Sequence, residues 1–169
     1  NFETSTCGWK DVSSGIYKWD HVRAKDSSAW SGPTTDVTTG TSNGKYMTVD
    51  ANNAGTSFTT AIMQSPPLGA ISIRCELGMW FHMYGGSNYY KNYLKVFIEN
   101  ATDPTDKYEV FRREDNQGDQ WNWAQFNLGR HDPGMKIVVE ATAGGSSMWS
   151  PWCTSHNDMT VDDVQFVNC

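Results

Sequence analysis

Four acidic residues, widely separated in the chain, carry the strongest candidate chemistry of this sequence. Glu3 lies near the start, and Asp36 lies in a segment rich in Ser, Thr and Gly. Asp162 and Asp163 form a pair close to the end, although Asp is depleted in strands and neighbouring like charges repel. Carboxylates held on flexible loops are the hard oxygen ligands that Ca²⁺ takes. We therefore expect Glu3, Asp36 and Asp162 to bind a structural calcium ion, with Asp162 preferred over Asp163.

A simpler role for two of these residues stays open. Asp and Glu side chains accept hydrogen bonds from backbone N–H groups in turns, without any ion. Glu3 and Asp36 both lie in segments that the sequence predicts to be turns or loops.

Aromatic side chains in predicted loops suggest a second kind of site. The chain has 8 Trp, and several rings fall outside any alternating pattern, namely Trp30, Tyr89, Tyr90, Trp149 and Trp152. Exposed rings stack on the apolar faces of sugars, and jelly-roll folds include lectins. The alternative is that these rings pack the loops onto the edge of the fold, because Trp is seldom fully exposed.

Nothing in the sequence favours catalysis. The chain contains no GxSxG, HExxH or phosphate-binding loop. The histidines His21, His82, His131 and His156 are scattered among predicted strands and loops. His82 falls opposite the apolar face of its strand, where a hydrogen-bonded structural role is expected. We expect no enzyme activity.

The cysteines indicate an oxidising compartment. Cys7, Cys75, Cys153 and Cys169 are even in number, and their spacing fits no zinc-binding pattern. Two disulfides are the better interpretation, since such bonds persist mainly outside the cytosol. Asn100 begins the glycosylation sequon Asn-Ala-Thr, which fits the same location.

These residues must be positioned by strands. Over Ala70–Gly85 the apolar residues alternate with polar ones, so that Ile71, Ile73 and every second residue to Met83 share one face. Such alternation is typical of a half-buried strand. No other segment has so long an apolar face, so we expect it to be the central strand of the core.

Shorter alternating segments supply its partners, and turn-forming residues separate them. The predicted strands are 17–24, 45–51, 57–64, 93–99, 108–113, 120–128, 135–142 and 160–167, with a long ordered loop over 25–43. At 169 residues the chain fits one domain. The expected fold is all-β, a single antiparallel β-sandwich of jelly-roll type over 1–169.

Charge and hydropathy exclude two classes of partner. The net charge is −6 and Lys plus Arg total only 13, without the basic stripe of a nucleic-acid-binding protein. No apolar run approaches the ~18 residues of a membrane-spanning helix.

Landmarks spread along the whole chain resemble the MAM domain, an extracellular module shared by meprins, neuropilins and receptor tyrosine phosphatases. The residues that carry the resemblance are Phe2, Glu3, Cys7, Gly8, Trp9, Trp19, Gly32, Pro33, Asp36, Gly44, Lys45, Tyr46, Met47, Val49, Asp50, Ser65, Pro66, Pro67, Leu68, Cys75, Phe81, His82, Met83, Leu94, Val96, Gly118, Asp119, Trp121, Val138, Val139, Glu140, Asp162, Asp163, Val164 and Cys169.

The resemblance implies a jelly-roll β-sandwich and a non-catalytic adhesion or assembly role outside the cell. It also implies a Cys75–Cys169 disulfide. The family usually has a Cys just before the Phe-Glu pair, bonded to the Cys of the Cys-Gly-Trp turn, but here Asn1 precedes Phe2. Because Cys153 is the extra cysteine of this chain, we expect Cys7–Cys153 to be the second bond.

The sequence thus favours an extracellular module, secreted or part of an ectodomain, that binds another protein or itself. The alternative is a lectin-like domain that binds glycans through its loop aromatics.

The loop aromatics give a testable prediction. Trp149→Ala should weaken partner binding by about 2 kcal/mol and leave the fold intact, because Trp is a common interface hot spot. Trp152→Ala should instead lower stability, since Pro151 and Cys153 hold its backbone in place. Melting and binding are measured for both variants. Early melting with normal binding for Trp149→Ala would make the loop structural.

Overall fold

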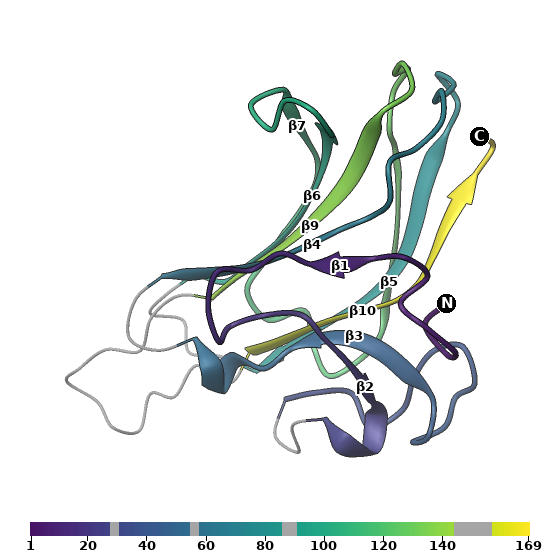
Figure 1. Ribbon diagram of the computed structural model, residues 1–169. Helices are drawn as coiled ribbons and strands as arrows, with labels where there is room; N and C mark the ends of the chain where they lie inside the picture. Colours follow the sequence, from purple (N-terminus) through teal and green to yellow (C-terminus); the bar gives the residue numbers. More distant parts are fainter. Residues whose placement is uncertain (28–30, 55–57, 86–90, 144–156) are drawn as a thin grey trace.

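The computed structural model describes residues 1–27, 31–54, 58–85, 91–143 and 157–169 as two stacked antiparallel sheets of five strands each (Figure 1). This arrangement confirms the predicted all-β sandwich of jelly-roll type. No helix among these residues is long and apolar enough to cross a membrane.

The first sheet has the order β1-β4-β9-β6-β7. Its strands are β1 (Lys10–Asp11), β4 (Thr59–Gln64), β9 (Met135–Ala143), β6 (Tyr93–Asn100) and β7 (Lys107–Glu114). The second sheet has the order β2-β3-β10-β5-β8. Its strands are β2 (Asp20–Arg23), β3 (Lys45–Val49), β10 (Asn157–Val167), β5 (Glu76–Gly85) and β8 (Asn122–Asn127). Two short 3₁₀ helices, η1 (Ala24–Asp26) and η2 (Ala51–Asn53), precede and follow β3.

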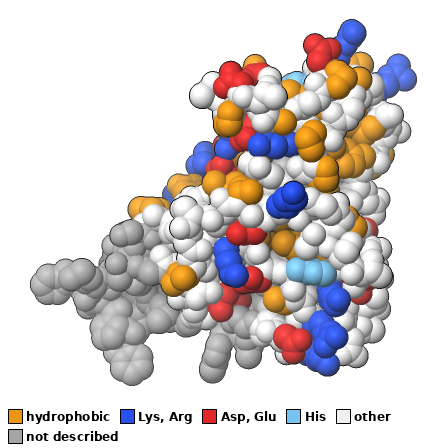
Figure 2. Space-filling model, viewed as in Figure 1, with side chains coloured by type: hydrophobic (Ala, Val, Ile, Leu, Met, Phe, Trp, Pro, Cys, Tyr) orange, Lys and Arg blue, Asp and Glu red, His pale blue; other side chains and the backbone are white. Residues whose placement is uncertain are grey.

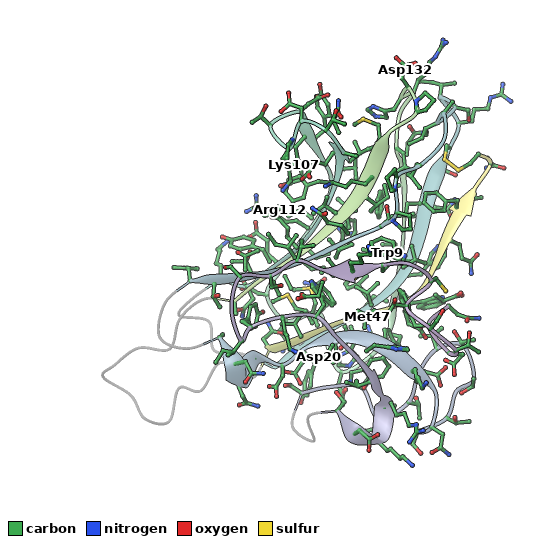
Figure 3. The ribbon with its side chains drawn as sticks, in the orientation of Figure 1. Trp9, Asp20, Met47, Lys107, Arg112 and Asp132 are labelled. Atoms are coloured by element: carbon green, nitrogen blue, oxygen red, sulfur yellow. A yellow bond between two sulfur atoms is a disulfide. The ribbon has the colours of Figure 1, made fainter. Side chains whose placement is uncertain are left out.

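The core lies between the sheets, where the alternating apolar side chains of both meet (Figure 3). Met79 and Met83 of β5 face Val96 of β6 and Val139 of β9 across this layer, and all four are fully buried. The N-terminal Trp9 also joins the core. In β5, period-two alternation therefore predicted the core face that Leu77, Met79, Phe81 and Met83 share.

The prediction for the 70–85 stretch was partly wrong. Strand β5 begins only at Glu76, and the middle strand of its sheet is β10. Upstream, Cys75 N–H donates to the Ser72 carbonyl in a turn, and Ile71 forms an isolated bridge with His131. The turn breaks the alternation and leaves Ile73 66% exposed instead of in the core.

Strand β2 is also shorter than predicted, because Tyr17 and Trp19 lie before it as buried residues. Trp19 N–H donates to the Asp11 carboxylate rather than to a neighbouring strand.

The outer face of the first sheet carries paired charges (Figure 2). Glu99 of β6 forms ion pairs with Lys136 of β9 at 3.0 Å and with Lys107 of β7 at 3.8 Å, and Lys107 also bonds to Glu140. Opposite charges on adjacent strands stabilise the sheet. They also make this face a poor template for unspecific pairing.

The outer face of the second sheet is partly covered by the loop that follows η1. The Tyr46 hydroxyl of β3 donates to the Pro33 carbonyl at 2.7 Å, and the Trp121 indole donates to the Thr35 carbonyl at 2.9 Å. This loop buries polar residues that point away from the core, including His82.

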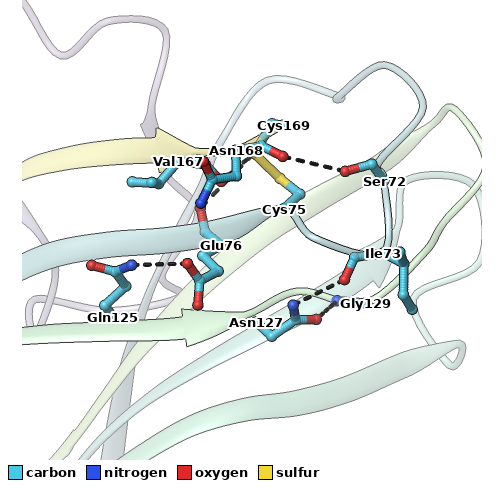
Figure 4. The surroundings of a disulfide bond; sticks show 10 residues. All are labelled: Ser72, Ile73, Cys75, Glu76, Gln125, Asn127, Gly129, Val167, Asn168 and Cys169. Atoms are coloured by element: carbon cyan, nitrogen blue, oxygen red, sulfur yellow. Dashed lines mark hydrogen bonds between the residues drawn. A yellow bond between two sulfur atoms is a disulfide. The ribbon is translucent and has the colours of Figure 1, made fainter.

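The disulfide Cys75–Cys169 joins the start of β5 to the C-terminus, as predicted (Figure 4). Cys7 has a free, exposed thiol, and Cys153, its predicted partner, lies outside the described residues, so the second bond stays a prediction. The Cys7 sulfur lies 3.2 Å from the Asn1 carbonyl, beside the first residue of the chain.

Removing the disulfide should destabilise the fold. The bond closes a sequence separation of 94 residues. On the chain-entropy model, such a closure stabilises by about 4–5 kcal/mol. The double variant Cys75→Ala, Cys169→Ala should lose an amount of this order in chemical denaturation, whereas the exposed Cys7→Ala should stay near the parent. Equal midpoints for the double variant and the parent would contradict this account.

Candidate metal centre

The three acidic residues selected from the sequence converge in the structure. Glu3 comes from the N-terminal segment, Asp36 from the loop before β3, and Asp162 from the middle of β10. One oxygen from each lies within 4.8 Å of the others. Asp36 and Asp162 are buried and Glu3 is half-buried. Residues separated by up to 159 positions thus share one site.

Asp36 is held by its own loop. Its carboxylate accepts the Thr39 N–H at 2.6 Å, the Thr39 hydroxyl at 2.7 Å and the Thr41 N–H at 3.0 Å. This is the turn-acceptor role that the sequence left open, and it fixes the carboxylate in one orientation. Gly44 packs against the other side, where an added Cβ would stand 2.0 Å from the Asp36 Cγ.

Asp162 fastens the same loop to β10. Its Oδ2 accepts the Val37 N–H at 3.2 Å and the Thr38 hydroxyl at 3.3 Å, while its Oδ1 accepts the Asp163 N–H at 2.6 Å. The strand register shifts directly after Asp162, and Asp163 has a positive φ of 47°. This bulge turns Asp163 away to accept a bond from Gln165, so Asp162 alone joins the cluster, as predicted.

The buried neighbour Phe2 fixes the position of Glu3. Phe2 is 2% exposed in the core, and the Phe2 carbonyl lies 2.6 Å from His21 Nε2. The Glu3 carboxylate then reaches β3, where Oε1 accepts the Lys45 N–H at 3.1 Å.

The electrostatics of the cluster are unfavourable without a counter-charge. Burial raises the pKa of the Glu3 carboxyl, and the carboxylates of Asp36 and Asp162 raise it further. Burial likewise raises the pKa of Asp162, although three backbone N–H groups donate to this carboxylate and act to lower its pKa. Burial would also raise the pKa of Asp36, but hydrogen bonds from Thr39 and Thr41 outweigh it, so that pKa is lowered. Hence the carboxyl groups of Glu3 and Asp162 both resist ionisation.

The donor set fits a hard divalent cation. Three carboxylates converge, and among the described residues no Lys or Arg forms an ion pair with any of them. Oxygen ligands supplied by the N-terminal segment, a loop and the bulged middle of a strand suit Ca²⁺. A bound cation would offset both the burial of these carboxylates and their mutual repulsion.

His82 is buried on the outer face of β5 and lies against a carboxylate. It is 1% exposed, and its Nε2 lies 3.1 Å from the Asp119 carboxylate. Burial lowers the pKa of His82, and Asp119 opposes that shift. Nδ1 has no hydrogen-bond partner within the described part of the chain.

The other predicted site residues are less well placed. Trp30, Tyr89, Tyr90, Trp149 and Trp152 lie outside the described residues, so the loop-aromatic site stays a prediction. Asn100 ends β6, where its Oδ1 accepts the Thr102 N–H at 3.0 Å and the Thr102 hydroxyl at 2.9 Å. Its glycosylation also stays a prediction.

The sequence did not indicate a hollow that lies between the end of β6 and the start of β7. It has a volume of about 400 Å³, and Asn100, Asp106, Tyr108 and His131 contribute to its lining. Tyr108 is 55% exposed there. The sequence gives little indication of this hollow, because polar residues next to a strand are common in any β protein.

Comparison with protein families decides what kind of module this is. The model for the MAM domain, meprin/A5/mu, matches residues 1–169. The chain belongs to the MAM family.

Two relatives of this MAM domain are much longer proteins. MAM domain-containing protein 2 of Homo sapiens is 26% identical over 167 residues, which is 98% of this chain and 22% of that protein. Neuropilin-1 of Xenopus laevis is 29% identical over 170 residues, which is 98% of this chain and 16% of that protein. The MAM domain thus corresponds to a small part of each.

Solved structures agree on the fold of the MAM domain. The K1 cleaved adhesin domain of Lys-gingipain from Porphyromonas gingivalis W83 has a TM-score of 0.60 at 12% identity, over 95% of this chain and 90% of that one. TmCBM61, solved in complex with β-1,4-galactotriose, has a TM-score of 0.58 at 11% identity, over 94% and 87%. At such identities the likeness concerns the β-sandwich alone.

The packing of Gly44 gives a prediction for the carboxylate cluster. Gly44→Ala should displace the Asp36 carboxylate, whose Oδ1 lies 2.1 Å from the new Cβ position. Crowding of this kind costs about 1–3 kcal/mol, measured by chemical denaturation. Gly15→Ala is the control, because no atom lies within 4 Å of its Cβ position. If the two variants were equally stable, Gly44 would not be what positions Asp36.

Proposed function

We propose that this MAM domain is an extracellular interaction module that mediates protein–protein adhesion or oligomerisation and has no catalytic activity of its own. Its partner is another extracellular protein or a second copy of itself. The observation that carries the proposal is the family match over residues 1–169.

The structure supports this proposal in two ways. The rigid sandwich is tied at the chain end by Cys75–Cys169, which fits an oxidising compartment. Its outer face on β6, β7 and β9 carries ion-paired charges that are largely sheltered, and Arg112 is exposed on the edge strand β7 (Figure 3). A fixed scaffold of this kind can present a recognition surface.

A structural calcium ion is part of the proposal. Glu3, Asp36 and Asp162 would hold it, and it would tie the N-terminal segment, the loop before β3 and strand β10 together. The ion would neutralise the cluster and supply no chemistry to a substrate. Its role is to fix the loop that covers the second sheet.

Carbohydrate binding is the second candidate function. TmCBM61, with a similar sandwich, was solved with a bound galactotriose. The observation that favours it here is the exposure of Trp123, 40% accessible on the face of a sheet.

Adhesion to cells can separate the two functions. Beads coated with the domain are added to a panel of cells treated with either protease or glycosidases, and bead–bead clustering is recorded in parallel. A protein partner predicts loss of adhesion after protease only, and self-association predicts clustering. Adhesion that glycosidases abolish and free sugar competes away would overturn the lead proposal in favour of the second.

The calcium site gives a separate prediction. At a Ca²⁺ concentration of about 100 times Kd, an ion that binds only the folded state should stabilise by about 2.7 kcal/mol. The melting midpoint should therefore fall in chelator and recover with Ca²⁺. An unchanged midpoint would refute the site.

Glu3→Gln makes the test specific. The Gln carbonyl can still accept the Lys45 N–H, but one ligand charge is lost. Ca²⁺ affinity should fall about tenfold, since affinity follows ligand charge. In chelator the variant should equal or exceed the parent in stability, because like-charge repulsion is relieved. The control is Asp132→Asn, an exposed carboxylate in the turn before β9 (Figure 3), which should change neither value.

A further inference from the structure

The uncovered half of the second sheet carries an exposed tryptophan on a flat face. Trp123 of β8 pairs directly with Trp80 of β5, and the two rings lie 5.4 Å apart at 55°. Trp123 is 40% exposed, although it lies within a strand. Nothing in the strand pattern requires a large ring to face solvent here.

A glycine in β5 leaves the space that this ring occupies. The glycine is Gly78, and a Cβ added there would lie 2.5 Å from both Cη2 and Cζ2 of Trp123. The indole therefore lies against bare backbone at Gly78 and beside Trp80, and 40% of the residue stays exposed. Gly within a strand often marks the close approach of another group. An aromatic ring that covers a glycine also stabilises a strand, and here the ring presents a further surface to solvent.

Planar polar side chains flank the ring in register. Gly78 pairs with Gln125 of β8 on one side and with Gln165 of β10 on the other, so all three lie in one row across the sheet. Both glutamines are exposed. Gln125 Nε2 donates to the Glu76 carboxylate at 2.8 Å (Figure 4), and Gln165 Nε2 donates to the Asp163 carboxylate at 2.6 Å.

Each amide keeps groups for a ligand. A glutamine side chain has two N–H donors and a carbonyl acceptor, and only one donor is used in each case. The carboxylates of Glu76 and Asp163 orient the amides and can accept further bonds from hydroxyl groups. The site stands on paired strands, which hold such groups more precisely than loops do.

We propose that Trp123, with Gln125, Gln165 and Glu76 around it, forms a binding platform for a neutral oligosaccharide of pyranose units. A pyranose presents an apolar C–H face that stacks on an indole and a rim of hydroxyls that bond to amides and carboxylates. The inference rests on, and locates a site for, the second candidate function.

Charge narrows the ligand class. The side chains named at the platform include carboxylates and no cation, and the chain has a net charge of −6. Sulfated or uronic-acid glycans would be repelled, so the platform selects neutral sugars. A protein hot spot is a poorer fit, because the centres of protein interfaces are depleted of charged residues.

Titration with neutral oligosaccharides tests the platform. Cello-, chito- and β-1,4-galacto-oligosaccharides are titrated into the intact domain by calorimetry, with a sulfated heparin oligosaccharide as the anionic comparison. At least one neutral series should bind saturably and the heparin oligosaccharide should not. Absence of any neutral binding, or tighter heparin binding, would overturn the inference.

Variants locate the site. Trp123→Ala should weaken binding about tenfold or more, on the scale of a lost aromatic anchor. Tyr108→Ala, which removes an exposed ring of the other sheet, is the control and should bind as the parent. Should Trp123→Ala fail to fold, the double variant Gln125→Ala, Gln165→Ala, with two exposed side chains removed, should show a loss of several-fold. Unchanged binding in the folded variant, or a loss in Tyr108→Ala instead, would contradict the platform.

The same variants separate this inference from the lead function. Protein-mediated adhesion or bead clustering that persists in Trp123→Ala, with sugar binding lost, supports two independent surfaces. Sugar binding that is absent in the parent while clustering remains overturns the platform alone.

Discussion

The pairing of β10 with β3 on one side and β5 on the other is the interaction on which the candidate sites depend. It brings the last strand of the chain into the middle of the second sheet. Met159 and Val161 face the core, while Thr160 and Asp162 point to the opposite face. Because that opposite face is also covered around Asp162, a strand that starts as an ordinary core strand carries a fully buried carboxylate. Burying such a charge is costly unless its partners are in place.

The hydrogen bonds of Asp162 and Asp36 show how that cost is reduced. Backbone N–H groups from residues 37–41 converge on both carboxylates, so the loop folds around its own Asp36 and around Asp162, which β10 supplies. These bonds stabilise the charged forms, but Glu3 adds a third carboxylate that repels them. The protein therefore fixes the geometry of the three carboxylates but does not balance their negative charge. The calcium ion that we propose would complete the balance.

The second sheet therefore has two different outer halves. Around Tyr46, His82 and Trp121 the loop seals the face and makes polar side chains part of a second, hydrogen-bonded layer. Among the described residues no such cover lies over Trp123, which is 40% exposed although Trp80 joins it in one row to the buried Asp162. The sealed part of the face lies over β3, β10 and the second half of β5, and the open part lies over the edge strand β8.

Local alternation in the sequence determined the fold class and the core face of β5, and the family resemblance implied the Cys75–Cys169 bond. The sequence also selected three carboxylates that converge. It could not determine that the strand expected to start near Ala70 starts at Glu76, since the turn at Ser72 depends on a bridge to His131 from a distant segment. It also could not show that Trp123 is open. Exposure on the second face of a sheet is decided by which loop covers it, and only tertiary packing sets that.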